Sequence, residues 1–350
     1  MRRFNPTWVL ALSCVGVVMT VIFWPSVELG KRKPVLSYYG DIDTALALAH
    51  EQNAAVFLGS SESCDSCNVP SAINSISDQS LRPAHLLARS GMGPFSYALL
   101  VPKIVNALKS DIPMIWLLNP VYFLEAQSRM EWMWIYDLIG DRNAALAIKS
   151  QLPTLAPKTS TLLISHLKWY NMLWPVILMQ QKIRAAMGRT AEQYTTGVAM
   201  SPALGGCDPH KAVLSAGTQW DQKRLWMMCR LFQQCDVNTS NESPSMLGSE
   251  DVIHALGRRP QKAAVVWLPV NIEWYVGQGM NQVQFLRDLT HIRMKVEAMA
   301  RSQNVLWVDL SSDHFPATEF ADRLHLNNAG TVRVSHVLMQ NSDIRKLLLK

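Results

Sequence analysis

Three side chains that could perform acyl chemistry stand far apart in the sequence. Ser61 follows a short apolar run in the segment AAVFLGSSES, residues 54–63. Asp322 and His325 are three positions apart in DRLHLNNAG, residues 322–330, a spacing that one helical turn or a tight loop can close. Serine is a weak nucleophile at neutral pH and needs a base to take its proton. We therefore predict a triad in which Ser61 attacks, His325 is the general base and Asp322 fixes the imidazole.

Acyl transfer passes through a tetrahedral oxyanion, and backbone N–H groups could stabilise it. We expect donors at Ser61 and at Gly91 or Gly93, with the Asn119 amide as a further candidate. One such donor typically lowers the barrier by roughly 3 kcal/mol. Asn119 could equally form the turn before Pro120, and both interpretations stay open.

The elements that must position these residues are five short apolar runs, which are typical of buried parallel strands. They are AAVFLG at 54–59, AHLLAR at 84–89, MIWLLN at 114–119, KAAVVWLPV at 262–270 and NVLWVDL at 304–310. Helical patterns at 96–110, 281–303 and 329–340 alternate with them or follow them. This alternation predicts an α/β fold with a parallel five-stranded sheet flanked by helices. Ligands of such sheets bind beyond the carboxyl ends of the strands, where the candidate residues stand.

The chain is expected to contain two parts. Residues 1–33 form an amino-terminal membrane anchor, because 17 residues from Trp8 to Trp24 carry no charge and begin and end with Trp. A cleaved signal peptide is the alternative. Lys and Arg flank the apolar run on both sides, so charge alone does not orient it. Residues 34–350 form the catalytic domain. The interval between its third and fourth strands far exceeds the length of a crossover, and about 121–255 is rich in Trp, Met and Leu with few strand signals, so we expect a helical insertion there.

Composition excludes some classes of function. The net charge of +6 is mild, and the chain lacks the dense basic pattern of a nucleic-acid binder. We expect neither a cofactor nor a metal, since a CxxC pair without a second ligand pair is a weak zinc signal. Two local disulfides and a free thiol would suit an oxidising compartment. The pairing among these cysteines stays open: Cys64, Cys67, Cys207, Cys229 and Cys235.

At these residues a family resemblance appears, over roughly residues 30–340. GSSES and DRLHLNNAG resemble the first and last blocks of the SGNH, or GDSL-like, hydrolase superfamily, and LPVNIEWYVGQG at 268–279 resembles a segment of its DltD family. The resemblance implies an SGNH-hydrolase-like, flavodoxin-like fold and the same triad. Two features depart from the family pattern: the second block reads Gly91-Met92-Gly93 instead of Gly-Gln-Gly, and Cys64 and Cys67 follow the nucleophile.

Three further residues are candidates for binding substrate. Glu62 could polarise the site, although capping of the following helix is favoured. Asn271 and Trp274 match positions of the DltD segment. They could line an acceptor groove, or they could hold the loop after the fourth strand.

The resemblance implies a membrane-anchored extracytoplasmic acyltransferase that moves D-alanyl or a similar small acyl group to a cell-envelope polymer such as teichoic acid. Its expected partners are a DltB-like membrane-bound O-acyltransferase, an acyl carrier system, the acceptor polymer and membrane lipid. Two alternatives stay open: an esterase that removes acyl groups from a cell-surface polymer, and a non-catalytic subunit that binds the membrane acyltransferase.

Overall fold

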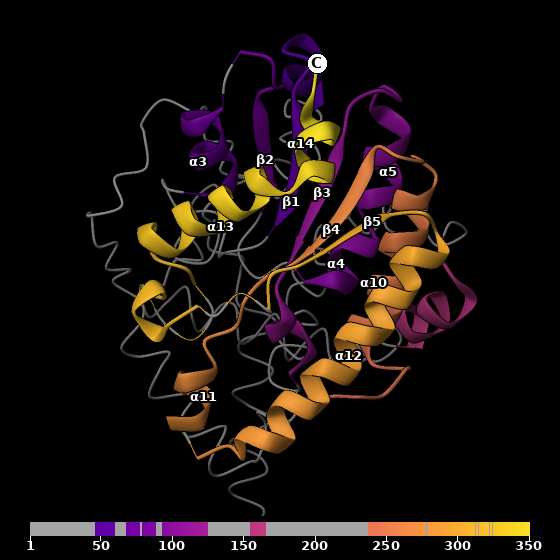
Figure 1. The fold of residues 1–350 in the computed structure, drawn as a ribbon. Helices are drawn as coiled ribbons and strands as arrows, with labels where there is room; N and C mark the ends of the chain where they lie inside the picture. Colours follow the sequence, from indigo (N-terminus) through magenta and orange to yellow (C-terminus); the bar gives the residue numbers. More distant parts are fainter. Residues whose placement is uncertain are drawn as a thin grey trace, which may run out of the picture.

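The computed structural model describes most of the chain that follows residue 45 (Figure 1). The described residues are 46–59, 68–77, 79–88, 93–124, 155–165, 237–277, 279–311, 313, 315–321, 323 and 325–350. Within these ranges, no helix combines the length and the apolar character needed to cross a bilayer. The anchor predicted at residues 8–24 lies outside them.

A single five-stranded sheet, parallel throughout, organises the described residues. Each strand lies within one of the five apolar runs, so the predicted parallel sheet is confirmed. The spatial order is β2-β1-β3-β4-β5. The strands are β1 (Ala55–Gly59), β2 (Ala84–Ala88), β3 (Met114–Leu118), β4 (Ala263–Trp267) and β5 (Leu306–Asp309).

Both faces of the sheet are buried, and successive side chains of each strand enter different cores. Val56 and Leu58 of β1 face one core, while Ala55 and Phe57 face the other. This is why the strands appear in the sequence as continuous apolar runs instead of alternating ones.

Helices cover the two faces in two layers (Figure 1). One layer contains α3 (Val69–Ile76), α13 (Asn328–Gln340) and α14 (Ser342–Leu348). The other contains α4 (Pro94–Ala98), α5 (Val101–Ala107), α10 (Pro244–Gly257) and α12 (Gln282–Ser302).

The helix expected at 96–110 is in fact two helices, α4 and α5. Pro102 lies in the first turn of α5, where its missing N–H group has no cost, whereas the same proline inside one continuous helix would remove a backbone hydrogen bond. The short α4 that results is buried along its whole length, and the hydroxyl of its Tyr97 bonds to the carboxyl ends of β1 and β2.

The chain leaves the sheet domain and returns to it at neighbouring positions on either side of the interval predicted as a helical insertion. Leu124 forms an isolated antiparallel bridge with Val237, and the N–H of Asn238 donates to the carbonyl of Phe123 at 2.8 Å. Both ends of the chain between 124 and 237 are therefore fixed side by side. The predicted boundaries at 121 and 255 enclose this closure and also include most of α10, which covers the sheet.

Helix α10 approaches α4 so closely that a glycine is needed at the contact. A Cβ atom added to Gly248 would lie 2.4 Å from the Cα of Phe95. The same helix carries Asp251, whose carboxylate accepts a hydrogen bond of 2.8 Å from the N–H of Ala156 and so caps the helix at 157–165. Burial raises the pKa of the Asp251 carboxyl, although this hydrogen bond opposes the rise.

We expect Asp251→Asn to be at least as stable as the wild type at neutral pH. The raised pKa means that the folded protein binds the Asp251 proton more tightly than the unfolded chain, so stability falls as pH rises from about 4, the carboxyl's unfolded value, through the folded value. Asparagine keeps the acceptor oxygen and cannot ionise. Urea unfolding at pH 4, 5.5 and 7 should therefore give a stability difference, variant minus wild type, that grows with pH. A difference that shrinks with pH would contradict the burial argument.

Candidate functional site

The carboxyl edge of the sheet is where the segments that carry the candidate residues follow the strands in the chain. All five strands end there, and the pairs Gly59–Ala88, Leu118–Trp267 and Trp267–Asp309 are in register. The elements that follow the strands at this edge are α4, η2 (Pro120–Phe123), α11 (Ile272–Gly277) and η5 (Ala317–Glu319). Two of them, α11 and η5, contact each other.

The proposed nucleophile lies between two anchored ends. Ser61 and Glu62 belong to residues 60–67, outside the described ranges. On one side the segment begins after Gly59, the last residue of β1. On the other side it ends at Asn68, which begins α3 with a capping box: its side chain accepts from the Ser71 N–H at 2.9 Å, and the Ser71 hydroxyl accepts from the Asn68 N–H at 3.0 Å.

His325 lies in a small hairpin that precedes α13. Phe320 and Leu326 form its antiparallel bridge, and the Ala321 N–H donates to the His325 carbonyl at 2.8 Å. The two bridge residues are buried in the same core as β4 and β5, and the His325 side chain is partly buried. Asp322 lies outside the described residues, so the triad stays a prediction.

Helix α13 holds this hairpin by polar contacts. The Arg333 guanidinium donates to both carboxylate oxygens of Glu319 at 3.1 Å and lies 4.6 Å above the centre of the Phe315 ring. Asn327 caps α13 through the Gly330 N–H at 3.0 Å, and its amide also donates to the Thr318 carbonyl at 2.7 Å. The same helix reaches the start of α3, where the Ser335 hydroxyl lies 3.3 Å from the Val69 carbonyl. The hairpin with His325 and the segment with Ser61 are thus attached to neighbouring helices.

The candidate oxyanion donors have local structural roles where the structure describes them. Asn119 is buried, and its side-chain oxygen accepts from the Val121 N–H at 3.0 Å, which starts η2. That is the turn-forming interpretation. Gly93 precedes α4, and its carbonyl accepts from the Tyr97 N–H at 3.1 Å. Gly91 lies outside the described residues. The oxyanion roles of all three stay predictions.

Asn271 and Trp274 hold the loop after β4. The side-chain oxygen of Asn271 accepts from the Trp274 N–H at 3.1 Å, so it begins α11. The Trp274 ring meets Tyr275 edge-on, with 5.0 Å between ring centres. These contacts agree with the second of the two interpretations, and the acceptor groove stays a prediction.

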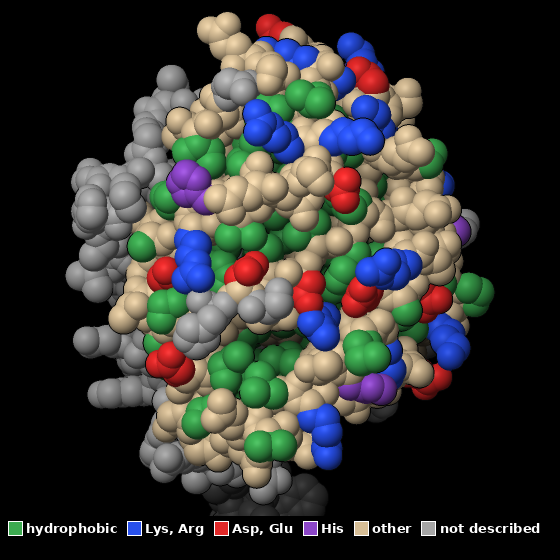
Figure 2. Space-filling model, in the orientation of Figure 1, with side chains coloured by type: hydrophobic (Ala, Val, Ile, Leu, Met, Phe, Trp, Pro, Cys, Tyr) green, Lys and Arg blue, Asp and Glu red, His purple; other side chains and the backbone are tan. Residues whose placement is uncertain are grey.

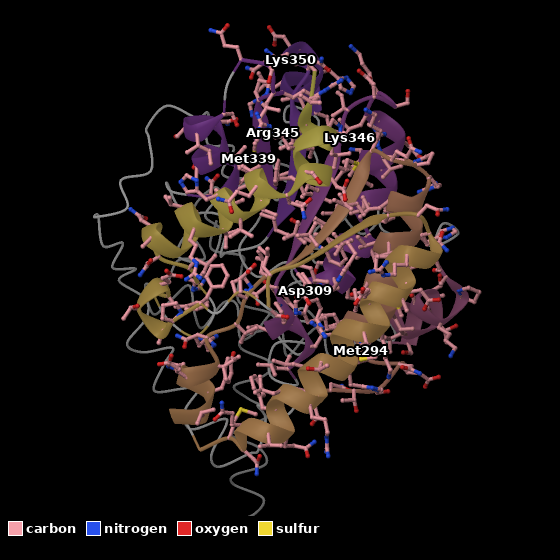
Figure 3. All side chains as sticks on the ribbon, in the orientation of Figure 1. Met294, Asp309, Met339, Arg345, Lys346 and Lys350 are labelled. Carbon is pink, nitrogen blue, oxygen red and sulfur yellow. The ribbon has the colours of Figure 1, made fainter. Side chains whose placement is uncertain are left out.

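An ion pair lies where β5 ends. Asp309 accepts a hydrogen bond from Arg293 of α12, and it also accepts from the Ser311 N–H at 2.8 Å. The basic residues labelled at the end of the chain, Arg345, Lys346 and Lys350, lie well above Asp309 in the view of Figure 3. The Arg82 N–H, just before β2, donates to the Leu348 carbonyl at 2.8 Å, so the end of the chain lies beside the amino end of that strand. The carboxyl edge is thus separated from this basic group.

Arg323 is a residue that the sequence does not single out. It stands two positions before His325, is only 7% exposed, and its Nε has no hydrogen-bond partner within the part of the chain that the structure describes. The Nε of the equally buried Arg259 also has no partner there, but its two terminal nitrogens donate to four backbone carbonyls. A single arginine in a turn gives no sequence signal of burial.

A metal site finds no support in the described ranges, where no group of three or more His, Cys, Asp or Glu side chains could hold an ion. The five cysteines named above lie outside these ranges. Comparison of the chain with models of protein families and with curated proteins gave no match.

We expect Gly330→Ala to disturb the hairpin that carries His325. A Cβ atom at this position would lie 2.2 Å from the Glu319 carbonyl oxygen and 3.0 Å from the Leu326 side chain. Overpacking of this kind typically costs about 1–3 kcal/mol. Urea unfolding should show a loss of that size.

Gly277→Ala is the matched control, because a Cβ atom there has nothing within 4 Å. It should leave the free energy of unfolding unchanged or raise it slightly. Equal stability of the two variants would contradict the close approach of α13 to η5.

Proposed function

We propose that the chain is a membrane-anchored, extracytoplasmic serine acyltransferase of the SGNH type. It would transfer D-alanyl or a similar small acyl group to a hydroxyl of a cell-envelope polymer. The observation that carries the proposal is the common edge. The segment containing Ser61 begins at the carboxyl end of β1, and the hairpin containing His325 packs among the residues that follow β4 and β5.

Strand order supports the SGNH assignment. The order β2-β1-β3-β4-β5 is the flavodoxin-like arrangement of doubly wound sheets, whose ligands bind beyond the carboxyl ends. The closure of the chain at Leu124 and Val237 supports the further proposal of an insertion within one catalytic domain. Fold alone does not determine chemistry, so the activity rests on the candidate residues.

The reaction would proceed in two half-reactions. The Ser61 hydroxyl attacks the carbonyl carbon of the acyl donor while His325 takes its proton, and Asp322 stabilises the imidazolium. Backbone N–H groups at Gly91 or Gly93, with Asn119, stabilise the oxyanion. The donor's leaving group departs with the proton from His325, which leaves an acyl ester on Ser61. A polymer hydroxyl then attacks this ester, His325 takes its proton and returns it to the Ser61 oxygen.

The partners and the location rest on the family resemblance and on the apolar run at residues 8–24. A DltB-like membrane O-acyltransferase with an acyl carrier system would supply the acyl group. On the face drawn in Figure 2, basic and acidic side chains are interspersed, unlike the basic stripe of a nucleic-acid binder. Glu62, Asn271 and Trp274 are the candidates for contact with the acceptor.

A fluorophosphonate probe tests the nucleophile in the full-length protein, because such probes react with serines that a neighbouring base activates. We expect labelling of the wild type and of Ser60→Ala, and none of Ser61→Ala. The Ser60→Ala variant is the control, since it removes the adjacent hydroxyl from the same segment. A wild-type protein that stays unlabelled would overturn the proposal and would favour a non-catalytic subunit.

Transfer and hydrolysis differ in the second half-reaction. We expect the wild type, incubated with a small acyl ester and a polymer bearing free hydroxyls, to form polymer-bound ester, and Ser61→Ala to form none. A second mixture without the polymer measures the rate at which free acid is released by hydrolysis alone. Release of free acid at the same rate in both mixtures would identify an esterase instead.

A further inference from the structure

A buried tyrosine hydroxyl joins the ends of two strands at the carboxyl edge. Tyr97 of α4 is 2% exposed. Its hydroxyl accepts from the Gly59 N–H at 3.0 Å and lies 3.0 Å from the Leu87 carbonyl. It also contacts the carbonyl of Gly59. One oxygen atom therefore touches the last residue of β1 and the next-to-last residue of β2.

The Tyr97 hydroxyl lies at the last pair of residues in the ladder between β1 and β2. In the parallel register, Ala55 pairs with Ala84 and its N–H donates to the Pro83 carbonyl. By the same alternation, the register places the Gly59 N–H opposite the Leu87 carbonyl, and the Tyr97 hydroxyl bonds to both groups. The Tyr97 hydroxyl thus lies against the pair of groups that closes the ladder.

Two functional segments leave the sheet at this rung. Ser60 and Ser61 come directly after Gly59, and the segment with Gly91 follows β2. The direction in which each segment leaves its strand depends on the backbone of the last rung. A group that bonds to both strand ends therefore fixes the two points at which these segments leave the sheet.

Tyr97 is packed both through the backbone of α4 and through its ring. Gly248 of α10 lies against the backbone of α4 at Phe95, and the Trp116 ring of β3 meets the Tyr97 ring edge-on, with 6.4 Å between ring centres. Packing on two sides leaves the hydroxyl little freedom, as a positioning group requires.

We propose that Tyr97 is a positioning residue for the acyl-transfer site: its hydroxyl sets the exit of the Ser61 segment from β1 relative to the segment that follows β2. The inference rests on the proposed function for its effect on rate. Its structural part, the ordering of the chain after Gly59, does not depend on that function.

Tyr97→Phe tests the inference, because it keeps the ring and removes only the hydroxyl. Misplacement of reacting groups by about 1 Å can cost on the order of 100-fold in rate, so we expect at least about a tenfold loss in kcat and in the rate of probe labelling at Ser61, with KM nearly unchanged. Amide hydrogen exchange should also accelerate in the peptide covering 55–63, with no change in β3 and β4.

Ser96→Ala is the matched control. Ser96 is the neighbouring residue, is fully buried, and its hydroxyl has no hydrogen-bond partner within the described ranges. Loss of this hydroxyl should leave labelling and exchange unchanged. Equal labelling rates, or exchange that accelerates throughout the sheet of Tyr97→Phe, would overturn the positioning role.

The two proposals fail in distinguishable ways. If the wild type is not labelled, the proposed function falls, and exchange at 55–63 still decides whether Tyr97 orders the segment. If Tyr97→Phe does not fold, wild-type exchange at single-residue resolution decides: the Gly59 N–H should exchange as slowly as that of Phe57. Fast exchange at Gly59 would overturn the inference.

Discussion

The parallel ladder is the constraint on which the rest of this protein depends. Because each strand runs in the same direction as its neighbours, the chain must cross back over the sheet between strands, and those crossings bury both faces. The same constraint brings Gly59, Leu118, Trp267 and Asp309 to one edge. Side chains that are separated by more than 250 positions in the sequence can then belong to one site.

Polar caps give this edge its definite shape. Asn68, Asn119, Asn271 and Asn327 each begin a helical segment there by accepting a backbone N–H. An asparagine cap satisfies a donor that the helix leaves unpaired and fixes the angle at which the chain enters the helix. The segments that follow the strands are consequently anchored at their ends, and the Arg333–Glu319 contact adds a side-chain link for the hairpin of His325.

The fold could be predicted from the sequence where burial leaves a local signal. Runs such as MIWLL at 114–118 are apolar throughout because both faces of the strand are covered. The division of 96–110 into two helices was missed, although Pro102 marks it. At the site, the sequence identified the edge but could not choose between a catalytic and a capping asparagine, since one side chain suits both tasks. Tyr97 and Arg323 gave no signal, because the contacts and burial of each are set by residues distant in the chain.

The bridge between Leu124 and Val237 has an evolutionary consequence. Since the chain is pinned where it departs and where it rejoins, the intervening length adds only slowly to the entropy of closure, about 0.6 kcal/mol for each doubling. Changes in the length of that stretch therefore cost little entropy, provided that they keep residues 155–165, where Leu155 and Leu163 are buried in the core and Ala156 bonds to Asp251. Insertions and deletions between Leu124 and Val237 could then accumulate in evolution while the framework of the sheet stays unchanged.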